Sequence, residues 1–99
     1  MNSRYRVTSN RESGMGRYDI QLKPFNQNLP GILIELKVLP KNTPTTAVND
    51  MLKELSEAAI AQIDQKFYSD EMRKDGIQRI MKIGIACFHK DIAISSIIE

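Results

Sequence analysis

Seven residues, Ile32-Leu33-Ile34-Glu35-Leu36-Lys37-Val38, form an apolar run that is broken only by two charged side chains. Isoleucine and valine in such a run favour a β-strand. Because side chains two positions apart on a strand share a face, Glu35 and Lys37 point the same way. The opposite face carries only apolar side chains and can form the core; its members are Ile32, Ile34, Leu36 and Val38.

The segment Gly16-Arg17-Tyr18-Asp19-Ile20 predicts a neighbouring strand, joined to the first by residues 23–31. If residues 18–22 and 32–38 pair as an antiparallel hairpin centred on Gln27, Asp19 and Glu35 become cross-strand neighbours with Cβ atoms roughly 5 Å apart. Like charges placed opposite each other destabilise a sheet. We therefore expect a positive charge between the two carboxylates, and a divalent cation is the obvious candidate.

Length and composition indicate one folded domain. The 99 residues are 41% hydrophobic and 26% charged, so we expect residues 1–99 to form a single domain around one core. No apolar run is long enough to span a bilayer, and the polar, basic start does not resemble a signal peptide. The lone Cys87 excludes an internal disulfide, and its apolar neighbours predict a buried thiol. These features favour a cytoplasmic protein with no membrane partner.

Charge is distributed unevenly along the chain. Residues 1–41 hold seven basic and three acidic residues, a net charge of +4, whereas residues 42–99 hold seven and nine, a net charge of −2. The basic part is the one that carries Asp19 and Glu35. A positive field there would guide a polyanion such as nucleic acid, although ordinary surface charge explains the same numbers.

Residue patterns predict five strands and one long helix. The expected strands are residues 5–9, 17–22, 32–38, 79–88 and 92–98, with a glycine turn at 11–16. A helix capped by Thr45 or Thr46 runs to about residue 66, with an apolar stripe of Val48, Met51, Leu52, Leu55, Ala58, Ala59 and Ile63. Residues 67–74 continue it or form a second short helix that ends at Gly76. Residues 79–88 are typical of a strand covered on both faces.

Several motifs in this order resemble those of the PD-(D/E)xK nuclease superfamily. They are Ser9-Asn10-Arg11-Glu12-Ser13-Gly14-Met15-Gly16-Arg17-Tyr18-Asp19, then Ile34-Glu35-Leu36-Lys37, then Gln62-Ile63 with Lys66 and Tyr68. Within the superfamily they resemble the branch usually found as the C-terminal domain of bacterial and archaeal proteins whose N-terminal part is AAA-ATPase-like. The resemblance implies an α/β, restriction-endonuclease-like core: a mixed sheet of about five strands, with an antiparallel N-terminal meander, flanked by helices.

The chain departs from this resemblance at its start. The helix that normally precedes the first strand is missing, because only Met1 to Arg4 stand before Tyr5, and so is the ATPase-like domain. A truncated core of this kind would leave sheet surface exposed. A second copy would cover it, so a homodimer is the hypothesis that follows.

The resemblance also implies roles for individual residues. Asp19 and Glu35 would bind Mg²⁺ or Mn²⁺, the backbone carbonyl of Leu36 would supply another ligand, and Lys37 would sit beside the attacking water. Gln62 would position the site or a substrate phosphate, or else satisfy a buried carbonyl.

Three further residues have open alternatives. Glu12 is a turn residue or a ligand for a second metal ion. Arg17 contacts phosphate or pairs with one of the acids, and Tyr68 packs in the core or lies near the site.

Two functions fit these residues. The first is a magnesium-dependent nuclease that acts on nucleic acid, with DNA as the expected substrate. The second is a nuclease-fold module that binds nucleic acid or a protein without cutting. Metal binding that depends on Asp19 and Glu35 distinguishes the two.

Overall fold

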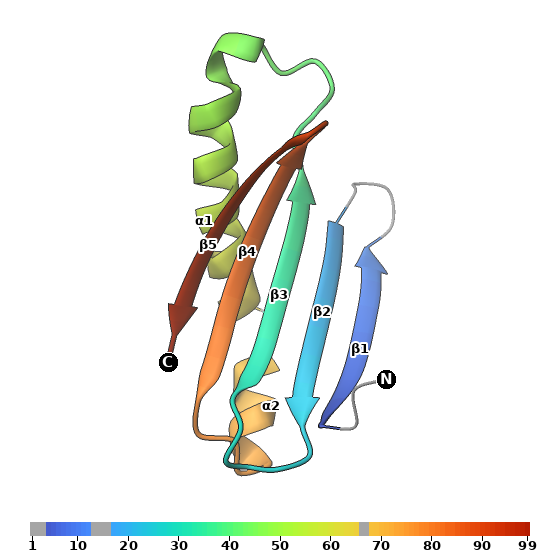
Figure 1. The fold of residues 1–99 in the computed structure, drawn as a ribbon, viewed down its shortest axis with the longest axis vertical. Coiled ribbons are helices and arrows are strands. Elements are labelled where there is room, and N and C mark those ends of the chain that lie inside the picture. The colour runs from blue at the N-terminus through green and yellow to red at the C-terminus, as the bar shows by residue number, and fades with distance from the viewer. Residues whose placement is uncertain (1–3, 13–16, 66–67) are drawn as a thin grey trace.

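A computed structural model describes residues 4–12, 17–65 and 68–99 and contains one five-stranded sheet in the order β1-β2-β3-β4-β5 (Figure 1). The strands are β1 Tyr5–Glu12, β2 Arg17–Pro24, β3 Gly31–Val38, β4 Ile80–Phe88 and β5 Asp91–Ile98. A short 3₁₀ helix, Thr45–Ala47, leads into α1, Val48–Gln65, and α2 follows at Tyr68–Lys74. All strand pairs are antiparallel except β3 with β4, which are parallel and are joined by the helical crossover.

This arrangement confirms the predicted mixed sheet with an antiparallel N-terminal meander, one long helix and a short second one. Residues 11 and 12 of the turn expected at 11–16 belong to β1, which continues through Glu12, and residues 13–16 lie outside the described part. Gly76 ends α2 with φ of 90°, as a left-handed helix terminus requires. No helix within the described ranges is long and apolar enough to cross a bilayer.

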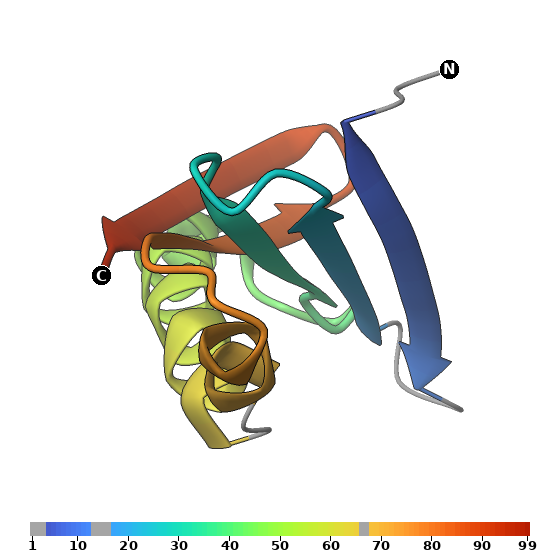
Figure 2. The ribbon, with the colours of Figure 1, turned by 90° about the horizontal axis from the view of Figure 1, so that it is seen from below.

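Both helices cover the same face of the sheet (Figure 2). α1 packs against β3, β4 and β5, and α2 packs against β3. On β3 the covered face is that of Leu33 and Glu35, each 1% exposed, whereas Val38 on the other face is 46% exposed. The expectation that Ile32, Ile34, Leu36 and Val38 form the core was therefore wrong. The helices cover the face that carries Leu33, Glu35 and Lys37, which is the less apolar of the two, so alternation along the strand alone pointed to the wrong face.

Two apolar clusters fill the space between the helices and the sheet. One consists of Leu33, Ile63, Met72, Ile77 and Ile80, and the other of Leu39, Val48, Leu52, Ala86 and Phe88. Between them Gly84 lets α1 approach β4 closely, since a Cβ atom there would lie 2.0 Å from the carbonyl oxygen of Ser56.

The buried stripe of α1 differs from the predicted one. Met51 and Ala58 are exposed, whereas Ser56 and Ile60 are buried. Ser56 is tolerated there because its hydroxyl donates to the carbonyl of Lys53 at 2.8 Å or shares a hydrogen bond with the hydroxyl of Ser95 at 2.7 Å. The buried stripe of α1 is therefore rotated about the helix axis relative to the stripe that its most apolar residues predict.

The face of β4 that points away from the helices is only partly buried, so the prediction that this strand is covered on both faces was wrong. Cys87 lies on that face and is partly exposed rather than a buried thiol.

Candidate active site

Asp19 and Glu35 are direct cross-strand partners in the β2–β3 pair. The hairpin register centred on Gln27 is thereby confirmed. Both carboxylates lie on the helix-covered face, where Asp19 is 4% and Glu35 1% exposed. Cβ atoms of directly opposed residues are about 4.5–5.5 Å apart, so the two carboxyl groups can reach one cation.

Two further side chains adjoin this pair. Lys37 follows Glu35 by two positions on β3, so it shares the same face, and it is half-buried. Tyr68, the first residue of α2, donates a hydrogen bond from its hydroxyl to Oδ2 of Asp19 at 3.3 Å. Its ring packs against the cluster that contains Leu33 and Met72. Tyr68 thus combines the two roles considered for it, because its ring packs in the core while its hydroxyl reaches the site.

The chemistry of these oxygen donors fits a small divalent cation. Two like charges that are buried side by side are unfavourable unless a positive charge compensates them. No group of three or more acidic, histidine or cysteine side chains gathers among the described residues. Mg²⁺ matches such a sparse site, because proteins usually bind it through one or two carboxylates and leave the remaining positions to water and phosphate oxygens.

Comparison with protein families identifies the family to which the chain belongs. A family model described as the PD-(D/E)XK nuclease superfamily matches residues 1–96. The chain is a member of the PD-(D/E)XK nuclease superfamily. No curated protein and no solved structure matches it significantly. Membership indicates metal-dependent nuclease activity, and with it a divalent cation and nucleic acid as ligands, without defining the ion or the substrate.

Two other residues that the motifs singled out lie on α1 and β3. Gln62 is half-buried on α1, next to Ile63 of the core. Leu36 occupies β3 between Glu35 and Lys37, and the role of its carbonyl stays a prediction.

Two further motif residues, Glu12 and Arg17, lie at the ends of β1 and β2. Glu12 and Arg17 are Cα partners at the ends of these strands, but their side chains lie outside the described part, as does Lys66.

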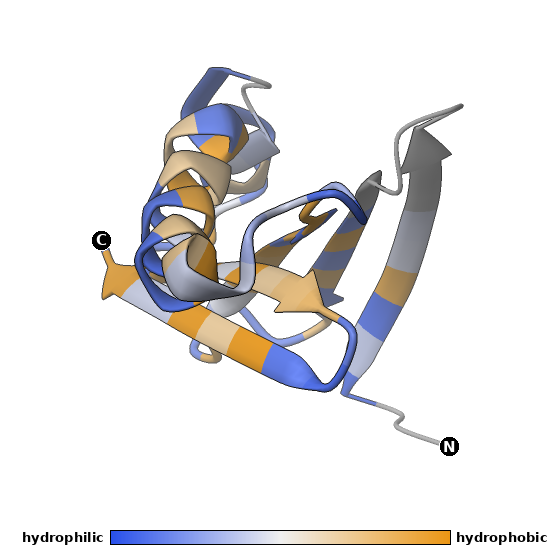
Figure 3. Ribbon diagram, turned by 90° about the horizontal axis from the view of Figure 1, so that it is seen from above, coloured by the Kyte–Doolittle hydropathy of each residue, from blue (hydrophilic) through white to orange (hydrophobic). Residues whose placement is uncertain are grey.

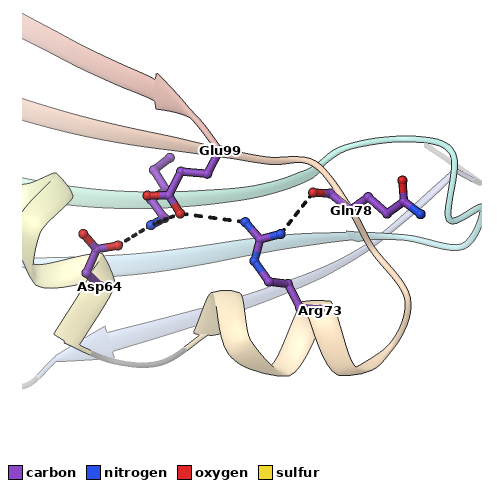
Figure 4. Close-up of polar contacts among 5 residues, drawn as sticks. Asp64, Arg73, Gln78 and Glu99 are labelled. Carbon is purple, nitrogen blue, oxygen red and sulfur yellow. Dashed lines mark hydrogen bonds and ion pairs between the residues drawn. The ribbon is translucent and has the colours of Figure 1, made fainter.

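Sequence reasoning missed Lys82, which lies inside β4 on the same face as Glu35 and is only 2% exposed. Its ammonium group pairs with Asp64 of α1 and with Glu99, the latter at 2.7 Å (Figure 4). Arg73 extends the network to Glu99 at 3.9 Å and to the carbonyl of Gln78 at 3.1 Å. The sequence feature that could have indicated this buried cation is a lysine inside the apolar run of residues 80–88. The network connects α1, α2 and the end of β5.

Burial alone lowers the pKa of Lys82, because it disfavours the charged form. The hydrogen bonds to Asp64 and Glu99, together with their negative charges, outweigh that effect and raise the pKa above the ordinary value of 10.5. Lys82 is therefore a permanent cation at neutral pH that holds the helical layer to the sheet.

A pocket of about 180 Å³ lies beside the site, between the first two strands and α2. Gln21 and Lys23 continue the face of Asp19 along β2 and help to line it, together with Arg6, Thr8, Glu71, Met72 and Asp75. Lys23 is ion-paired with Asp75. Because acidic residues balance the two basic ones, the pocket supplies no strong positive field of the kind that the charge distribution predicted.

Proposed function

We propose that this PD-(D/E)XK protein is a metal-dependent nuclease that hydrolyses phosphodiester bonds in nucleic acid, with DNA as its substrate. The observation that supports the proposal is the direct pairing of two buried carboxylates, Asp19 and Glu35, with Lys37 two residues further along the same strand face. A solvated strand face with alternating polarity would leave these acids exposed, whereas both are almost fully buried.

Asp19 and Glu35 hold the Mg²⁺ or Mn²⁺ ion in this proposal, with the Leu36 carbonyl as a further oxygen ligand. The ion, when bound, supplies an activated water and neutralises charge on the phosphoryl oxygens. The hydroxyl of Tyr68 fixes the orientation of Asp19 through their hydrogen bond.

The Lys37 ammonium group stabilises charge that develops on the phosphoryl oxygens and orients the attacking water. Gln62 and Arg17 contact substrate phosphates, and Glu12 is the candidate ligand for a second ion. These assignments rest on the motif resemblance.

Three finer proposals come from the resemblance and the composition. We infer that the chain belongs to the branch that accompanies AAA-ATPase-like domains, that it acts in the cytoplasm, and that it is a homodimer. Sequencing the surrounding gene for an ATPase-like segment tests the first inference, and cell fractionation tests the second.

The decisive experiment measures cleavage of supercoiled plasmid, single-stranded DNA and single-stranded RNA with Mg²⁺ or Mn²⁺. Wild type is compared with Glu35→Gln and with Glu57→Gln, a matched control on the exposed side of α1. We expect cutting by wild type and by the control, and none by Glu35→Gln. Comparing the three substrates also tests the preference for DNA.

Titration calorimetry with Mn²⁺ supplies a readout that does not depend on turnover. Glu35→Gln should lose binding, whereas Lys37→Ala should keep it and lose cleavage, because lysine is no metal ligand here. Nucleic acid bound equally well in a chelator, with no cutting by any variant, would instead establish the non-cleaving module.

A further inference from the structure

The sheet face that points away from both helices is almost entirely apolar. Cross-strand partners share a face, so the pairing register defines its rows. We call the following residues of β2 to β5 the open face: Ile20, Leu22, Ile32, Ile34, Leu36, Val38, Met81, Ile83, Ile85, Cys87, Ile92, Ile94, Ser96 and Ile98. None of them is charged, and Ser96 is the one hydroxyl among them; Tyr18 of β2 belongs to the same rows, but its side chain lies outside the described part.

No described helix lies over this face (Figures 2 and 3). Its largest exposures are on β5, where Ile92 is 61%, Ile94 66% and Ile98 67% exposed. Hydrophobic residues recur along that strand in Figure 3. On β1 the next partner in the row, Val7, is 60% exposed. Apolar patches of more than a few hundred Å² are rare on monomers and mark interaction surfaces.

The open face is in the size range of a protein–protein interface. Its four strands at about 4.8 Å spacing are about 19 Å wide, and eight residues at about 3.3 Å are about 26 Å long. The flat footprint is therefore about 500 Å², before the relief of the side chains is added. A standard interface buries about 800 Å² on each partner.

We propose that two copies of this chain associate through their open faces, sheet against sheet. A surface without charges offers little to select a different partner, because charges and hydrogen bonds supply much of the specificity of interfaces. A twofold pair requires only that the patch complement itself, and rows of branched aliphatic side chains can interdigitate with a rotated copy. Twisted sheets pack in this way about 10 Å apart, with their strands inclined by about 30°.

The dimer would be a four-layered assembly of helices, sheet, sheet and helices. Asp19 and Glu35 lie on the helix-covered face, so the two sites would face outward on opposite sides. Association therefore does not depend on the proposed nuclease activity. A variant that separates the copies should keep its affinity for Mn²⁺, which makes failure of one proposal distinguishable from failure of the other.

Sedimentation equilibrium tests the association directly. Wild type should show twice the 11.3 kDa chain mass. Ile94→Glu should raise the dimer Kd at least about 100-fold, because twofold symmetry places two carboxylates in the interface. Phe25→Glu is the control, since Phe25 is 68% exposed but lies in the loop after β2; it should dimerise as wild type does. Circular dichroism verifies that each variant is folded.

Labelling of Cys87 with a thiol reagent reports whether the open face is the surface that becomes covered. Its rate in wild type should fall as protein concentration passes the dimer Kd, and in Ile94→Glu it should stay fast. A wild type that remains monomeric at all concentrations overturns the proposal, whether its thiol reacts fast or is shielded by another segment. A dimer in which Cys87 reacts as fast as in the monomer places the contact elsewhere and overturns it too.

Discussion

Replacing Gly84 with alanine tests the packing that holds the helical layer beside the site. A Cβ atom at this position would lie 2.0 Å from the Ser56 carbonyl oxygen and 3.1 Å from Ala59 Cβ. The nearest obstacle is the backbone of α1, which cannot turn aside as a side chain can. The helix must move by about 1 Å or more to restore a normal contact.

The expected loss of stability follows from these contacts. Overpacking a well-packed interior costs about 1–3 kcal/mol, and a clash with backbone belongs at the upper end. Loss of unfolded-state freedom from glycine to alanine offsets about 0.4–1 kcal/mol of this. The net loss is about 2 kcal/mol, which lowers Tm by about 8–16 °C in a domain of this size.

Gly31→Ala is the matched control, because its Cβ would lie 2.5 Å from the sulfur of Met72, the flexible part of a side chain. It should cost less than about 1 kcal/mol. Thermal and urea unfolding measure both variants. Equal stability of Gly84→Ala and wild type would refute the close approach of α1 to β4. Because Gly84 is the Cα partner of Glu35, Gly84→Ala should also weaken Mn²⁺ binding.

Three further predictions concern the polar contacts. Lys82 has a raised pKa in the folded state, so its ion pairs contribute their full stability below the ordinary pKa of 10.5. This contribution is lost as the pH rises through the higher folded-state pKa. Urea unfolding should show this alkaline loss of stability in wild type and not in Lys82→Met. The double variant Asp64→Asn with Glu99→Gln should be less stable at pH 7 than Lys82→Met, since it leaves a buried ammonium group without charged partners, and the reverse order would contradict this account. Tyr68→Phe should weaken Mn²⁺ affinity about 10-fold and slow cleavage while changing unfolding by under about 1 kcal/mol; unchanged affinity would remove its hydroxyl from the site.

Local spacing determined the central pairing of this protein. Two strands joined by a loop can meet in few registers, so equal distances from Gln27 brought Asp19 opposite Glu35. Gly76 likewise ended α2 where the sequence predicted, because only the local backbone conformation is involved. The lysine two positions after Glu35 shares its face through the same strand parity.

Other features depend on segments that are distant in the sequence. Lys82 is buried with charged partners from α1 and from residue 99, and no local sequence pattern predicts that these three residues are in contact. The side of α1 that faces the sheet depends on Gly84, because the absence of a Cβ there lets the backbone at Ser56 come close to β4. With Ser56 against the sheet, Met51 and Ala58 are exposed.

By itself the sequence determined the strands and the hairpin register that places Asp19 opposite Glu35. Only the tertiary structure decided which face of the sheet the helices cover, and therefore that the two acids are buried while the isoleucine-rich face of β5 stays open. The physical reason is that periodicity relates side chains within one element, whereas the face that becomes buried is decided by the helices that pack against it.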